Sequence, residues 1–219
     1  MPSSSSSSSC SIRRETYTIW MKSLVLNSYG YTAFDSNGKL VFRIDNYDTK
    51  CRSEVYLMDL HGNIICTILR KKLLRFGLWD CYKDKDSCKP WFKVGKTFGL
   101  FKNDSVYDVL VGTNESKRRS SSNHKIKGSI HKVEFNIIDG EGRIAAMIQR
   151  KLSSSGVVLG EDVLCVTVEP HVDHLFVMAL VAIHGLIRRK MPLVELQPFI
   201  VEIVGTTLVG VKLEDIYPI

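Results

Sequence analysis

One apolar stretch, Leu175–Ile183, limits most strongly what this chain can fold into. It extends to Ile187 with a short interruption at His184-Gly185, and it is too short to span a membrane, which needs about 20 apolar residues. A helix that is apolar on nearly every side has to be enclosed by protein. We therefore predict a buried helix, capped at its start by Asp173 and followed by the basic run Arg188-Arg189-Lys190.

The residues before this helix alternate between apolar and polar, which is the period of β-strands. Tyr29, Tyr31 and Ala33 step by two, and the same step recurs from Leu40 to Ile44 after an Asn-Gly turn signal. Further strands are predicted at 91–94, 106–111, 130–138 and 163–168, with a polar loop at 112–123. In a domain made of strands, the natural surroundings of an enclosed helix are a closed sheet.

A D-x-x-G pattern occurs three times, at Asp35–Gly38, Asp59–Gly62 and Asp139–Gly142. In each copy an aliphatic residue follows the glycine by two positions and another by six. The Asp side chain can cap its own turn, and the glycine takes the left-handed position. We predict three equivalent hairpins, although D-x-x-G is also a common turn by itself. The last two copies are followed by basic pairs, which suggests a closer internal repeat.

The composition is that of one globular domain with short appendages: 219 residues, 44% hydrophobic and 24% charged. The seven serines Ser3–Ser9 contain no apolar core of a secretory signal, so we expect residues 1–15 to be disordered. The six cysteines show no C-x-x-C spacing and are expected to be reduced. We assign 16–190 to the domain and 191–219 to an atypical C-terminal tail.

Two short patterns imitate binding motifs but are incomplete. Gly95-Lys96-Thr97 resembles the end of a phosphate-binding loop, but Pro90 stands where the first glycine is needed. His171 and His174 are spaced to share a metal, but no third ligand is evident. We interpret the histidines as residues at the start of the helix.

Two further patterns also lack essential parts. Cys81 and Cys88 have no histidine at a catalytic spacing. Asp80, Asp84 and Asp86 alternate as calcium ligands do, but the glycine and the distal glutamate of such a loop are absent. We therefore predict a protein that is not an enzyme, with no cofactor and no metal. It carries no nucleic-acid-binding motif, and we expect a monomer.

Basic residues offer the one candidate surface for a ligand. The chain has a net charge of +7, and Arg70-Lys71-Lys72 and Arg150-Lys151 follow equivalent strands of the repeat. These five residues could meet at one rim of a barrel and bind anionic lipid headgroups, or they could simply keep the surface soluble. Arg118-Arg119 precede Ser121 as in targets of basophilic kinases, so Ser121 is a candidate phosphorylation site.

Five blocks of sequence carry a resemblance to a known family. They are Trp20-Met21-Lys22-Ser23-Leu24, Phe42-Arg43-Ile44-Asp45-Asn46-Tyr47, Glu54-Val55-Tyr56-Leu57-Met58-Asp59, Lys89-Pro90-Trp91-Phe92 and Val168-Glu169-Pro170. In this order they closely resemble the plant LURP-one-related family, over about residues 16–188. The resemblance implies a tubby-like fold, mainly β: a closed antiparallel barrel of about twelve strands around a C-terminal hydrophobic helix.

The resemblance also implies a function. The family is related to tubby-like proteins and phospholipid scramblases, has no established enzymatic activity, and has a founder linked to pathogen defence. We therefore expect a cytoplasmic protein tethered to membranes through phosphoinositides or other anionic phospholipids, at the plasma membrane or released to the nucleus. The alternatives are a lipid-handling activity of scramblase type and a scaffold for protein partners.

Overall fold

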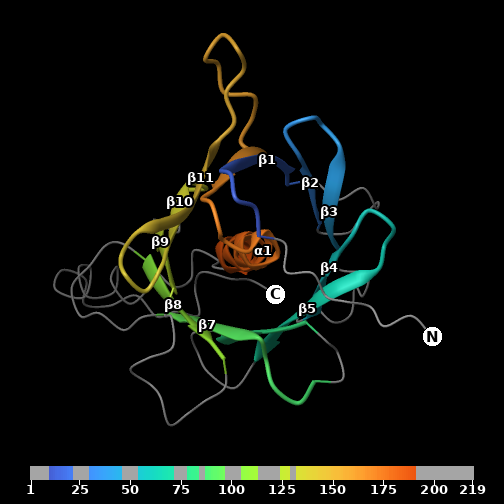
Figure 1. Cartoon of the computed structure of the whole chain (residues 1–219), viewed down its shortest axis with the longest axis vertical. Coiled ribbons are helices and arrows are strands. Elements are labelled where there is room, and N and C mark those ends of the chain that lie inside the picture. Colours follow the sequence, from blue (N-terminus) through green and yellow to red (C-terminus); the bar gives the residue numbers. More distant parts are fainter. Residues whose placement is uncertain are drawn as a thin grey trace, which may run out of the picture.

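The alternating segments form strands that close into a barrel around a single helix, as Figure 1 shows end-on. The computed structural model describes residues 10–21, 30–45, 54–71, 78–83, 87–96, 105–112, 124–128 and 132–190. Its elements are β1 (Glu15–Trp20), β2 (Tyr31–Phe34), β3 (Leu40–Asp45), β4 (Glu54–Met58), β5 (Ile64–Lys71), β6 (Leu78–Tyr82), β7 (Phe92–Lys96), β8 (Ser105–Val111), β9 (His124–Gly128), β10 (Phe135–Ile138), β11 (Ile144–Arg150), β12 (Val163–Val168) and α1 (His174–Lys190). The predicted barrel and central helix are confirmed.

The barrel is a meander in which each strand pairs antiparallel with the next, and β1 closes the ring on β12 from Glu15↔Val168 to Trp20↔Val163. All odd-numbered strands therefore run in one direction. The β2–β3, β4–β5 and β10–β11 turns lie at the end where α1 starts, which we call the capped end. The β11–β12 connection lies at the other end, which we call the distal end.

The interior of the barrel is filled by the helix. Inward residues alternate along the strands, as in β12, where Leu164, Val166 and Val168 are buried. Every residue of α1 from His174 to Gly185 is buried, including the whole apolar stretch that the sequence singles out. An all-round apolar helix is stable here because strands surround it on every side.

The three D-x-x-G turns are equivalent, as predicted. In each one, the Asp carboxylate accepts hydrogen bonds from backbone amides two and four residues ahead; for Asp139 these are Glu141 N and Arg143 N, both at 2.9 Å. The glycine has a positive φ, 86° at Gly142. Each turn follows a register shift in its hairpin, so the three copies share the bulge as well as the turn.

A fourth turn of this kind lies at Ser153–Gly156, at the distal end. Gly156 N donates to Ser153 O at 3.0 Å, and Val157 N donates to Ser153 Oγ at 3.1 Å. Gly156 has φ 80°. A serine hydroxyl thus replaces the Asp carboxylate, which is why the D-x-x-G pattern did not reveal this hairpin.

One prediction about local structure needs correction. Among the described residues, the strand expected at 130–138 is present only as β10, Phe135–Ile138. The strand β9, His124–Gly128, was not predicted, because it presents only Ile126 as a fully buried apolar side chain and gives little alternation to read. Within the predicted N-terminal segment, Cys10 pairs with Asp173, and His171 N donates to Ser11 O at 2.7 Å. Residues 1–9 and the tail at 191–219 lie outside the described residues.

Candidate functional site

The capped end is organised around Asp173, the N-cap of α1. Its Oδ1 accepts hydrogen bonds from Leu175 N at 2.9 Å and Phe176 N at 3.4 Å. These bonds satisfy amides that have no partner within the helix. Its Oδ2 lies 3.7 Å from Lys83 Nζ, and that ammonium lies 4.0 Å from the centre of the Trp91 ring. One carboxylate thus joins the helix start to the loop after β6.

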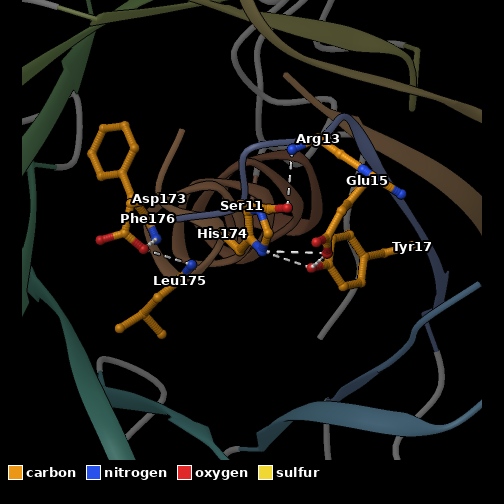
Figure 2. A network of polar contacts seen from close by, with 8 residues as sticks. All are labelled: Ser11, Arg13, Glu15, Tyr17, Asp173, His174, Leu175 and Phe176. Carbon is orange, nitrogen blue, oxygen red and sulfur yellow. Dashed lines mark hydrogen bonds and ion pairs between the residues drawn. The ribbon is translucent and has the colours of Figure 1, made fainter. Parts of the chain in front are cut away.

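His174, the first residue of the helix, belongs to a buried chain of hydrogen bonds drawn in Figure 2. Tyr17 Oη donates to Glu15 Oε2 at 2.6 Å and lies 2.7 Å from His174 Nδ1. Because the single phenol proton goes to Glu15, Nδ1 carries a proton and donates it to Tyr17. Burial raises the pKa of Tyr17, and the hydrogen bond from Tyr17 lowers the pKa of Glu15.

The segment 10–14 crosses the start of the helix ahead of β1 (Figure 2). In addition to its backbone contacts with Asp173 and His171, it is held by Arg14, whose guanidinium lies 3.0 Å from the Glu169 carboxylate. His171 adopts φ 63°, which lets the chain turn from β12 into the helix. The capped end is therefore held by polar contacts between the segment 10–14 and the connection from β12 to α1.

A cavity of about 660 Å³ opens beside this segment. Its aromatic wall consists of Trp91, His124 and Phe176, with ring centres 5.7 Å apart for Trp91 and Phe176 and 4.9 Å apart for His124 and Phe176. Its acidic groups have basic partners, as Asp139 has Arg143 at 2.9 Å. A cavity of this size could hold a small flat apolar molecule. Its balanced charge does not select a charged one.

Most of the described residues of the incomplete motifs belong to strands, to the core or to the start of the helix. His174 is engaged with Tyr17, and among the described residues no three His, Cys, Asp or Glu side chains are grouped to hold a metal. Gly95 and Lys96 lie in β7 and not in a loop. Cys81 is fully buried, and burial together with its hydrogen bond to Cys66 raises the pKa of its thiol. Asp84 and Asp86 lie outside the described residues.

The two predicted basic pairs lie at the same end of the barrel but on opposite sides of it. Arg70-Lys71 end β5 and Arg150-Lys151 follow β11, and six strand-to-strand steps separate β5 from β11 in either direction around the ring. Twelve strands spaced by about 4.8 Å enclose a diameter of roughly 20 Å, well beyond a Debye length of about 8 Å. The two pairs therefore do not form one cluster.

Each of these four cations also has a local partner. Arg70 lies 5.9 Å from the Trp79 ring, and Lys71 lies 3.8 Å from Asp80. Arg150 lies 3.7 Å from both Glu134 and Glu161, and Lys151 donates to the Thr18 hydroxyl. The fifth cation, Lys72, and the candidate phosphorylation site, Ser121, lie outside the described residues.

A different group of cations, which sequence reasoning missed, lies on the outer surface of β7–β9. Lys93, Lys125 and Lys127 are exposed, and none forms an ion pair with another described residue. We call them the lysine face. The alternation Lys125-Ile126-Lys127 was a visible signal, since Ile126 is buried and its neighbours must face outward. Lys93 joins them only through the register of β8, opposite Leu110.

The model of one protein family, LURP-one-related, matches residues 15–185. The chain belongs to the LURP-one-related family. Among its curated relatives, LURP-one-related 4 of Arabidopsis thaliana is 44% identical and the match covers 81% of this chain and 80% of the relative. LURP-one-related 3 of the same plant is 43% identical over 81% of this chain and 82% of the relative. The resemblance found in the sequence is thereby confirmed.

A solved structure supports the fold. The X-ray structure of a protein from Arabidopsis thaliana aligns with a TM-score of 0.59, covering 81% of this chain and 93% of that protein, at 23% identity. At this identity the likeness shows the fold alone. Within the part of the chain described here, none of the helical structure combines the length and apolarity needed to cross a bilayer.

Proposed function

We propose that this LURP-one-related protein is a non-catalytic module that attaches reversibly to membrane surfaces rich in anionic headgroups. The observation that carries this proposal is the lysine face, Lys93, Lys125 and Lys127. By strand geometry Lys125 and Lys127 are about 7 Å apart. Lys93 is two strands away and, by the registers of β8, two residues further along than Lys125, so it lies about 12 Å from Lys125 and about 17 Å from Lys127. All three side chains point outward from neighbouring strands, so an extended phosphate-bearing surface faces all three lysines at once.

The expected strength is modest. Each lysine near an anionic surface contributes about 1 kcal/mol, and Asp108, directly opposite Lys125 on β8, offsets part of this. An attraction of this size suits reversible attachment and depends on salt. The five cations predicted from the sequence strengthen the attraction to an anionic surface less than their number suggests, because four of them already have local partners.

The filled barrel favours attachment over lipid transport. A scramblase-type activity needs an apolar lumen that admits an acyl chain, but Val177, Leu180 and Ile183 of α1 are fully buried within the barrel. The architecture of twelve strands around a central helix is the basis on which we propose a relationship to tubby-like proteins and scramblases. A scaffold for protein partners is the competing function, and the liposome experiment separates it from membrane attachment.

Co-sedimentation with liposomes of phosphatidylcholine and phosphoinositide, at low and high salt, tests the proposal. The wild type should sediment with acidic but not neutral vesicles at low salt. Replacing Lys93, Lys125 and Lys127 with Gln should weaken binding by about 2 kcal/mol, or roughly thirtyfold. A matched control replaces three exposed cations elsewhere, Arg13, Lys39 and Lys89, and should bind nearly as the wild type does.

A second variant tests the cations predicted from sequence. Replacing Arg70, Lys71, Lys72, Arg150 and Lys151 together with Gln should weaken binding less than the lysine-face variant does, despite removing more charge. If the wild type ignores acidic vesicles at low salt, membrane attachment is wrong and a protein partner is the better function. If the five-residue variant alone loses binding, the attachment site is at the distal end and not on the lysine face.

A further inference from the structure

The connection between β11 and β12, residues 151–162, is a hairpin that extends away from the barrel wall, at the top of Figure 1. It presents four exposed aliphatic side chains: Leu152 and Leu159 are each 53% exposed, Val157 is 64% exposed and Val158 is 44% exposed. Most exposed apolar side chains of a protein are scattered singly and need no explanation. Four exposed aliphatic side chains within eight residues of one projecting hairpin do need an explanation.

Both faces of this hairpin are apolar. Leu152 pairs with Val158, so these two side chains lie on one face, and by the alternation of strands Val157 and Leu159 lie on the other. Neither face is covered by the described part of the barrel. A groove on a protein partner covers most easily a single face, whereas a lipid bilayer surrounds an inserted element on all sides.

The turn at the hairpin tip is closed internally. Four amides, those of Ser153, Gly156, Val157 and Leu159, donate to acceptors within the hairpin, and the Ser153 and Ser155 hydroxyls lie 2.8 Å apart. Amides bonded in this way lose little when they leave water. The backbone groups outside these bonds still need water or headgroups, which limits the hairpin to the surface layer of a bilayer.

An aromatic residue stands at the base of the hairpin. Trp20 pairs with Val163, is 40% exposed, and donates its indole N–H to Asp162 Oδ2 at 3.2 Å. Tryptophan is enriched at the boundary between lipid and water, because its ring is apolar and its N–H is polar. Trp20 therefore stands where the headgroup layer would lie if the aliphatic residues beyond it entered the lipid.

We propose that this hairpin inserts Leu152, Val157, Val158 and Leu159 into the boundary between the headgroups and acyl chains of a bilayer. At its base the cations Arg150 and Lys151 are outnumbered by the carboxylates of Glu134, Glu161 and Asp162, so charge adds no attraction to an anionic bilayer there, and the affinity of the hairpin is apolar and nearly independent of salt. This inference rests on the proposed function: the lysine face attracts the protein to the surface, and the hairpin then holds it there.

The test uses the full chain and vesicles of phosphatidylcholine and phosphatidylserine, at low salt and at about 1 M salt, where screening acts over about 3 Å. The double variant Leu152→Gln and Leu159→Gln should bind about tenfold more weakly than the wild type at both salt concentrations. The control, Leu60→Gln and Ile64→Gln, changes two exposed aliphatic residues at the equivalent β4–β5 turn of the capped end and should bind as the wild type does.

A reporter variant, Val157→Trp, gives a second measurement. Its emission should shift to the blue when vesicles are added, and brominated acyl chains should quench it. If the wild type binds at low salt and the double variant binds as tightly as the wild type at both salt concentrations, the hairpin does not insert, although the lysine face still attaches the protein. If the double variant instead melts at a lower temperature, the leucines are covered in the folded chain, which also overturns insertion. No binding by the wild type contradicts the proposed function itself.

Discussion

The two ends of the barrel use the same turn and surround it with different side chains. At the capped end, turns built on Asp35, Asp59 and Asp139 stand around a helix start that Asp173, His174 and Tyr17 tie down with hydrogen bonds. At the distal end, a turn of the same shape is built on Ser153 and followed by three exposed aliphatic residues. Backbone geometry is thus common to both ends, and the side chains around the turns differ.

The inner surfaces of the two ends differ in the same way. Near the helix start, aromatic rings of Trp91, His124 and Phe176 meet beside a cavity. Near the helix finish, Tyr31 packs tightly against Gly185, and Phe135 stacks on His184 with 3.8 Å between ring centres. Substitutions should therefore be tolerated less well at the distal end.

The largest effect is expected for Gly185→Ala. A Cβ at this position would overlap the Tyr31 hydroxyl oxygen and lie 2.9 Å from Tyr31 Cζ, so the helix or β2 has to move. Overpacking of this kind should lower the free energy of unfolding by about 3 kcal/mol in urea denaturation. Adding Tyr31→Phe removes the overlapping oxygen and should restore part of the loss. A single variant as stable as the wild type would mean that the contact is not tight.

Acid should destabilise the protein through His184, whose pKa burial lowers from 6.5 to about 3. Between these values the unfolded chain takes up a proton and the folded chain does not, so stability falls as pH decreases through this range. From pH 6.5 to 4.5 we expect a loss of about 2 kcal/mol by urea denaturation. His184→Leu should flatten this dependence; an unchanged slope would show that other groups cause it.

At the capped end, Asp173→Ala should cost about 1 kcal/mol, the usual contribution of an N-cap. Asp173→Asn keeps an oxygen for the Leu175 and Phe176 amides but removes the charge facing Lys83, an exposed pair that contributes little. Thermal melts should therefore place the Asn variant close to the wild type and the Ala variant clearly below it. Equal losses for both variants would assign the effect to the ion pair.

The smallest effect is expected for removal of the tail. The buried part of α1 already fills the barrel before Lys190, so a chain that ends at this residue should keep a near-native melting temperature. A much lower melting temperature, or an insoluble product, would mean that residues 191–219 belong to the domain. The predicted boundary would then be wrong, and the distal end would differ from the capped end in a further respect.

Features with a local cause could be predicted from the sequence. The helix followed from its own apolarity, and the three Asp turns followed from residues within four positions of each other. The lysine face could not be predicted, because Lys93 and Lys125 are brought together by the registers of β7–β8 and β8–β9. The separation of Arg70 from Arg150 also depends on the number of strands in the closed ring, which no single segment reveals.

Closure of the ring between β1 and β12 affects how the protein folds during its synthesis. During synthesis from the N-terminus, the first eleven strands leave the ribosome as a sheet with two unpaired edges and an apolar surface that nothing covers. The strand that closes the ring and the helix that fills it are both made after residue 162. Pairing across so long a stretch of chain is intrinsically slow. Nascent chains of this protein should therefore depend on chaperones until the ribosome has released nearly the whole domain.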